Sequence, residues 1–296
     1  MLAEWERGAT IVLQGLHLRR PELAAFCRSL ERELGHPTQV NAYYTPRSAQ
    51  GLPVHHDTHD VFVLQVAGEK RWLVYEPAWE LPLRNQKYTA EMGGPGDPVH
   101  DLVLQPGDML YLPRGWLHEA LTSDADSLHL TVGVNVVTWL DAFKAALEEC
   151  GGEVAFRRSI DAGSPEELLA LLQDRVRPEA VRRRADRRLA RTRRPIRDGQ
   201  LAQLRALDGL DLETPLERRE TALVDASSVD GSFVLVFDGK EVALPGRIRE
   251  ELEWVLEAEG PFTAADLPGG LDGGSRLVLV RRLVREGLLR QRRIAT

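Results

Sequence analysis

The sequence predicts a mixed α+β protein in which a β-rich domain precedes two regions with helical patterns. Short apolar stretches separated by turn signals fill residues 1–137, which is typical of a β-sandwich or barrel of the jelly-roll kind. A region rich in Arg, Glu, Leu and Ala with helical spacing covers residues 138–218. In residues 219–296, a strand pair, helices and a closing strand resemble a winged-helix domain.

The first region is expected to begin with a short strand and a helix. Residues 11–13 are apolar, and residues 20–34 place Leu and Phe at helical spacing behind Pro21. Further strands are expected at residues 39–45, 61–66, 71–75, 109–112 and 127–137. Pairs such as Pro106-Gly107 mark the turns between them.

The other two regions follow a helical period. In the middle region, helices are expected over residues 139–150, 165–189 and 201–207. In the last region, strands are expected at 233–237 and 242–244, helices at 248–258 and 275–286, and a closing strand at 288–289.

Composition excludes several classes of protein. The 296 residues contain no apolar run long enough for a membrane span, and residues 1–8 do not resemble a secretory signal. The two cysteines form no close pair, so a reducing, cytoplasmic location is expected. The net charge of -7 argues against a general nucleic-acid binder.

Charge is concentrated in one segment. Residues 175–197 contain eleven arginines and two acids, a charge of +9, which leaves -16 for the rest of the chain (-7 minus 9). Such a run is usually a solvated helix face that pairs with acids, and we favour that interpretation. Contact with RNA or an acidic partner is the alternative; nucleic acid is possible but not favoured.

A candidate metal site begins at Pro53-Val54-His55-His56-Asp57. Residues two apart on an extended strand point to the same side, so His55 and Asp57 would face one space and His56 the other. His118 follows the turns Pro106-Gly107-Asp108 and Pro113-Arg114-Gly115 and is the natural third ligand. Two histidines and one carboxylate with open positions are the ligand set of non-haem Fe(II) oxygenases.

Both half-motifs resemble those of the cupin superfamily. Gly51, His55, Asp57 and Gly68 match the first half, and residues 106–118 match the second. Together with Asn41-x-Tyr43, Gly68-x-Lys70-x-Trp72 and Leu128-His129-Leu130-Thr131, they resemble the JmjC-type ribosomal oxygenases. The resemblance is specific over about residues 39–133.

The resemblance implies a fold, an activity and partners. The family has a double-stranded β-helix (cupin, jelly-roll) JmjC domain, a helical dimerisation domain and a winged helix, which implies domains at 1–137, 138–218 and 219–296 and a homodimer. It hydroxylates side chains of ribosomal proteins with Fe(II) and 2-oxoglutarate. The family position that binds the distal carboxylate of 2-oxoglutarate matches Lys70, and Asn41 and Tyr43 are candidate contacts to the co-substrate or to the residues around it.

Several alternatives remain open. The triad could serve a metal-binding cupin with a regulatory role, and the same chemistry would serve an N-methyl-lysine demethylase. His59 shares the parity of His55 and Asp57, so it is either a fourth ligand or a wall of the pocket, and we favour the wall. Gly133 stands where some family members have serine, so the choice of substrate cannot be carried over.

Overall fold

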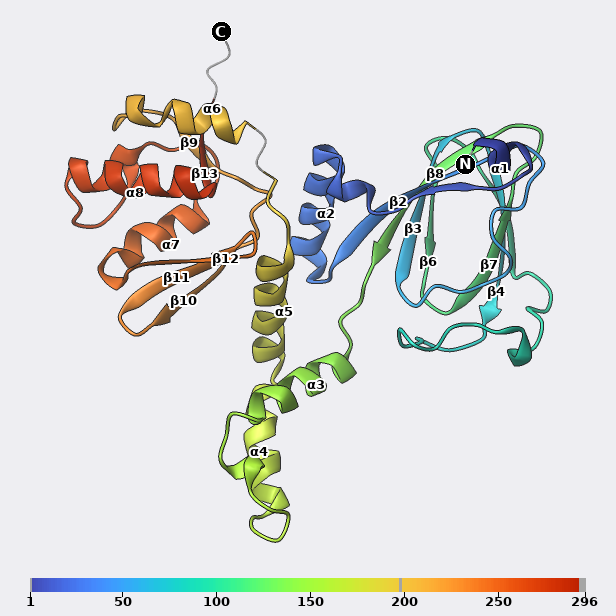
Figure 1. The fold of residues 1–296 in the computed structure, drawn as a ribbon, viewed down its shortest axis with the longest axis horizontal. Coiled ribbons are helices and arrows are strands. Elements are labelled where there is room, and N and C mark those ends of the chain that lie inside the picture. Colours follow the sequence, from blue (N-terminus) through green and yellow to red (C-terminus); the bar gives the residue numbers. More distant parts are fainter. Residues whose placement is uncertain (1, 197–198, 293–296) are drawn as a thin grey trace. The chain divides into compact units, whose positions relative to one another are not determined.

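The computed structural model describes residues 2–196 and 199–292 and forms two compact units, Met1–Asp141 and Ala142–Thr296 (Figure 1). Within these described ranges, no helix combines the length and apolar character needed to cross a bilayer. The boundary expected near residue 218 stays a prediction.

The first unit is a jelly roll of two antiparallel sheets that lie opposite each other (Figure 1). One sheet has the order β1-β2-β8-β3-β6, and the other has the order β5-β4-β7. The strands are β1 Ile11–Leu13, β2 Thr38–Thr45, β3 Asp60–Ala67, β4 Lys70–Pro77, β5 His100–Leu104, β6 Met109–Leu112, β7 Trp116–Leu121 and β8 Ser127–Val134. The short helices are α1 Leu2–Glu6, η1 Leu16–Leu18 and η2 Ala90–Met92.

Helix α2 (Pro21–Leu34) covers part of the first sheet. Pro21 opens the helix, where its missing amide hydrogen costs nothing, and Gly35 ends it in the left-handed conformation. Cys27 on the helix packs with Val40 of β2 and Val132 of β8 in one buried cluster. The barrel interior holds a second apolar cluster, made of Val61, Val63, Trp72, Val74, Leu104, Leu112 and Ala120.

Helices dominate the chain after β8. They are α3 Trp139–Cys150, η3 Ala155–Arg157, α4 Pro165–Arg175, α5 Pro178–Thr192, α6 Gln200–Arg205 and η4 Leu207–Gly209. The prediction of a single helix over residues 165–189 is wrong, because α4 ends at Arg175 and α5 begins at Pro178. Proline has no amide hydrogen and clashes with the preceding turn, so Pro178 starts a new helix instead.

The described part of the arginine segment forms ion pairs along α5. Arg184 bonds Glu149 through both its Nε and Nη2 atoms, at 2.7 and 2.6 Å. Arg191 pairs with Glu241. These contacts agree with the favoured interpretation of a helix face that pairs with acids. Arg197 lies outside the described residues.

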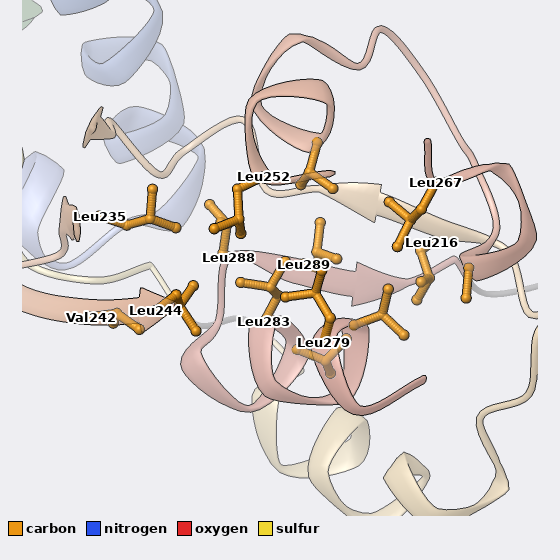
Figure 2. Close-up of a cluster of buried hydrophobic side chains, with 14 of the residues drawn as sticks. Leu216, Leu235, Val242, Leu244, Leu252, Leu267, Leu279, Leu283, Leu288 and Leu289 are labelled. Atoms are coloured by element: carbon orange, nitrogen blue, oxygen red, sulfur yellow. The ribbon is translucent and has the colours of Figure 1, made fainter. Parts of the chain in front are cut away.

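The last part of the chain closes around a leucine-rich core (Figure 2). Its elements are β9 Leu216–Arg218, β10 Asp225–Val229, β11 Ser232–Phe237, β12 Lys240–Pro245, η5 Gly246–Ile248, α7 Arg249–Glu257, η6 Ala264–Asp266, α8 Gly273–Glu286 and β13 Leu289–Gln291. Strands β10, β11 and β12 form an antiparallel sheet, and β13 pairs with β9. Leu216, Leu252, Leu283 and Leu289 are fully buried between these elements.

Candidate metal centre

Three side chains from separate parts of the barrel meet at one point. His55 and Asp57 lie in the loop before β3, and His118 lies on β7. One ligand atom from each lies within 4.8 Å of the others, and His118 Nε2 is 3.8 Å from Asp57 Oδ2. The structure therefore brings together the three residues expected to form a metal site.

Backbone hydrogen bonds hold the loop against β7. The loop is not a regular strand as expected, but His55 forms an isolated antiparallel bridge with His118. The His118 amide donates to the His55 carbonyl at 2.8 Å, and the Gly115 amide donates to the Asp57 carbonyl at 3.0 Å. A β-bridge on one side and a turn on the other thus fix the two loop ligands.

Gly115 is required in the turn before β7. Its φ of +92° is a conformation that side chains disfavour, and a Cβ there would lie 2.3 Å from the Trp79 carbonyl oxygen. The neighbouring Arg114 amide donates to Asp60 Oδ1 at 2.9 Å, which ties the turn to the start of β3. The glycine of the second half-motif therefore serves to place His118.

Both histidines present the same nitrogen to the centre. Nδ1 of His55 lies 2.8 Å from the Pro53 carbonyl, and Nδ1 of His118 lies 3.0 Å from the Trp116 carbonyl. Because a carbonyl can only accept, each Nδ1 carries the hydrogen and each Nε2 keeps a lone pair for a metal. Burial, with the charge of His55, lowers the pKa of His118 to about 4, so His118 is neutral at pH 7.

The donor set fits a divalent transition metal. Ligand atoms about 2.1 Å from one ion and at right angles to one another lie about 3 Å apart, so binding would draw the three side chains inward. Two imidazoles and a carboxylate on one side of an ion leave other coordination positions open, the arrangement typical of non-haem iron sites.

A cavity of about 210 Å³ adjoins the three residues inside the barrel. Its apolar wall includes Val61, Val63 and Leu112. Its polar wall includes Tyr43, Lys70, His129 and Thr131. A small polar molecule in this cavity would contact both the metal ligands and Lys70.

Lys70 is a buried cation at the first position of β4. It is only 2% exposed, and its Nζ donates to Thr45 Oγ1 at 2.8 Å. No carboxylate in the described part of the chain forms an ion pair with it, and burial lowers its pKa to about 8. A Cβ on Gly51 would lie 3.3 Å from Nζ, so this glycine leaves room beside the ammonium group.

Tyr43 and Asn41 differ in position. Tyr43 lines the cavity and stacks on His129 with ring centroids 5.0 Å apart. Burial and the charge of Asp57 raise the pKa of Tyr43 above its ordinary value, which favours the protonated hydroxyl. Asn41 is not among the described lining residues; its Oδ1 accepts from the Gly15 amide at 2.9 Å. A contact between Asn41 and a co-substrate stays a prediction.

Sequence reasoning assigned no role to Thr45, Thr10 or Trp72. Thr45 follows Asn41 and Tyr43 at two-residue spacing on β2, a parity that could have placed it beside Lys70. Thr10 bonds Thr45 at 3.0 Å from a distant part of the sequence, which no local pattern indicates. Trp72 packs edge-on against His129 at 5.4 Å.

The remaining histidines divide between core and surface. His56, expected on the outer face, is buried, and its Nε2 bonds the Gln86 carbonyl at 2.9 Å, because a loop covers that face. His100 is exposed. His59 is not part of the three-residue group; a Cβ on Gly133 would lie 2.6 Å from its ring.

Comparison with known families agrees with this geometry. A model of the JmjC domain matches residues 17–142, a range that contains the three candidate ligands and Lys70. Residues 17–142 are a JmjC domain, similar in sequence to part of curated ribosomal oxygenases.

Curated proteins similar to this JmjC domain include a demethylase and hydroxylase and a ribosomal oxygenase from animals. The chain is 40% identical over 131 residues to the "bifunctional lysine-specific demethylase and histidyl-hydroxylase NO66" of Drosophila persimilis, covering 44% of this chain and 19% of that protein. It is 40% identical over 129 residues to "ribosomal oxygenase 2" of Rattus norvegicus, covering 43% of this chain and 27% of that protein. The chain therefore spans less than a third of the length of either relative.

A solved structure resembles the whole chain. Escherichia coli ribosomal oxygenase YcfD superposes with a TM-score of 0.55 over 96% of this chain and 78% of that chain, at 19% identity. At that identity, the likeness establishes only that the two chains share a fold.

Proposed function

We propose that this protein is an Fe(II)- and 2-oxoglutarate-dependent oxygenase that hydroxylates a protein side chain. The observation that carries the proposal is the buried Lys70 ammonium, which shares a cavity with His55, Asp57 and His118 but has no carboxylate partner among the described residues. A buried cation is costly without an anion, so the cavity favours a carboxylate-bearing ligand close to the metal.

Each residue has a distinct task. His55, Asp57 and His118 would hold Fe(II) and leave positions open for the oxo acid and O2. Lys70, oriented by Thr45, would neutralise the distal carboxylate of 2-oxoglutarate. When bound, the two groups supply the oxidation that couples release of CO2 and succinate to the insertion of one oxygen atom into a substrate C–H bond. The apolar wall excludes water from that reaction.

A side chain of a ribosomal protein is the proposed substrate. Support comes from the names of the relatives, which are ribosomal oxygenases or histidyl-hydroxylases, and from a related YcfD structure described as a complex with cobalt and 2-oxoglutarate. The Drosophila relative is also named a lysine-specific demethylase. Demethylation would use the same metal and oxo acid, so only identification of the substrate and product distinguishes the two activities.

The activity can be tested with purified protein. Anaerobic loading with Fe(II) and then 2-oxoglutarate should give a weak visible charge-transfer band, and O2 should then release succinate. Asp57→Ala should lose both signals, whereas the matched control Asp97→Ala, at an exposed loop position, should keep them. A wild-type protein that gives neither signal would favour a regulatory metal-binding cupin.

The substrate requires a separate measurement. Ribosomal proteins from cells with and without the gene should differ in mass by one oxygen atom on one side chain. Loss of a methyl group from lysine instead would assign the demethylase activity.

The remaining regions extend the proposal. We infer catalytic, dimerisation and winged-helix domains at 1–137, 138–218 and 219–296. Exposed apolar residues spaced along α3 support a dimer face: Trp139 (60% exposed), Leu140, Phe143 and Leu147. The order α7, η6, α8 and β13 supports a winged helix. Sedimentation that shows only a monomer would contradict the dimer. We also propose a cytoplasmic location, on the basis of the proposed ribosomal substrate.

A further inference from the structure

A groove of about 740 Å³ lies in the second unit, between the end of β12 and helix α8. It shares no residue with the barrel cavity, and the proposed oxygenase activity does not use it. The residues that line it combine a positive rim with an apolar floor.

The rim carries uncompensated positive charge. Arg247, Arg281, Arg282 and Arg285 line the groove, with Asp272 as the one acid among its described lining residues. Asp272 accepts from the Ser275 amide at 2.7 Å as the cap of α8. Arg247 and Arg285 are exposed and form no ion pair with any residue in the described ranges.

The two inner arginines also leave charge available. Arg282 bonds Glu286 at 2.8 Å, but Glu286 is already paired with Lys240 at 2.5 Å. Arg281 donates to the Leu210 carbonyl at 2.7 Å, which satisfies a hydrogen bond without neutralising the charge. Its Nε is buried and has no hydrogen-bond partner among the residues that the structure describes.

The floor can hold an aliphatic side chain. Leu244, Ile248 and Leu279 are buried beneath the groove, and Val278 is 69% exposed beside them. Val278 precedes Arg285 by seven residues on α8, which places them roughly 10 Å apart along the helix axis. Extended peptide covers that distance in about three residues.

We infer that this groove binds a short acidic peptide segment of a protein partner, with an aliphatic anchor about three residues from a pair of carboxylates. The anchor packs on the floor beside Val278, and the carboxylates meet Arg247 and Arg285. Single-stranded nucleic acid fits less well, because the described lining residues include no aromatic side chain on which a base could stack.

The full-length chain can be tested by fluorescence anisotropy with three labelled probes. The first is a short peptide with leucine three residues from two glutamates. The second keeps the glutamates and replaces leucine with glycine, and the third is a single-stranded oligouridine. The double variant Arg247→Glu with Arg285→Glu removes the rim, and Arg183→Glu with Arg188→Glu is the charge-matched control at exposed positions of α5.

The leucine peptide should bind the wild type more tightly than the glycine peptide does. The rim variant should weaken binding by about tenfold or more, and the α5 control by less than about twofold, with thermal unfolding unchanged in both. The inference is overturned if the leucine peptide does not bind, if both double variants weaken it equally, or if only oligouridine binds in a rim-dependent way.

Discussion

The first unit surrounds a polar cavity, whereas the second unit closes around leucine side chains. In the barrel, Lys70, His118 and His129 are buried beside apolar strand residues. In the second unit, the interior is filled by apolar side chains such as Leu283 and Leu289, which are fully buried (Figure 2). Buried polar groups without partners reduce stability, whereas buried leucines increase it. The comparison suggests that chemistry and stability are concentrated in different parts of this chain.

The largest expected effect comes from opening the leucine core. Leu283→Ala should lower the free energy of unfolding by about 2–5 kcal/mol, because a fully buried side chain leaves a cavity. Chemical denaturation followed by circular dichroism measures the change. Val278→Ala is the control on the same helix and should change stability by less than about 0.5 kcal/mol, since Val278 is 69% exposed. Equal effects of the two variants would contradict the comparison.

A smaller effect is expected in the barrel, where a substitution should reduce ligand binding and leave stability intact. Lys70→Met should weaken 2-oxoglutarate binding about 10- to 100-fold, the equivalent of one charge-assisted hydrogen bond of about 1.5–3 kcal/mol. Because the substitution removes a buried cation, the unliganded protein should be no less stable than the wild type.

Calorimetric titration and thermal unfolding together measure both parts of that prediction. Lys87→Met, at an exposed position in the same unit, should leave affinity and stability unchanged. If Lys70→Met keeps full affinity for the oxo acid, Lys70 does not bind the carboxylate.

The smallest effect concerns pH. Burial lowers the pKa of Lys70 to about 8, so the ammonium form predominates below that pH and is lost above it. Binding of an anion requires the charged form, so the affinity for 2-oxoglutarate should hold below about pH 8 and fall by up to about tenfold per unit above it. Titrations between about pH 7 and pH 9 measure this change. In Lys70→Met the same dependence should be absent.

Sequence reasoning predicted the fold better where patterns are local. Alternation and turn residues indicated β1, β2, β3, β4, β6 and β8, but β5 and β7 were missed because histidine and acidic side chains interrupt their apolar residues. The break before Pro178 was also missed, although the proline itself was visible.

The candidate site was predicted by motif more than by geometry. Spacing brought His55 and Asp57 together, but the bridge to His118 depends on strand pairings that only the folded chain defines. Burial of His56 and the contact of Thr10 with Thr45 likewise depend on distant segments. Local spacing could not predict them.

The contact between His59 and Gly133 limits how the sequence of this pocket can change over time. A Cβ at position 133 would lie 2.6 Å from the His59 ring, so a serine there is tolerated only after His59 has moved or become smaller. The residues accepted at the two positions are therefore expected to depend on each other. Among descendants of this chain, they should vary together even though they are distant in sequence.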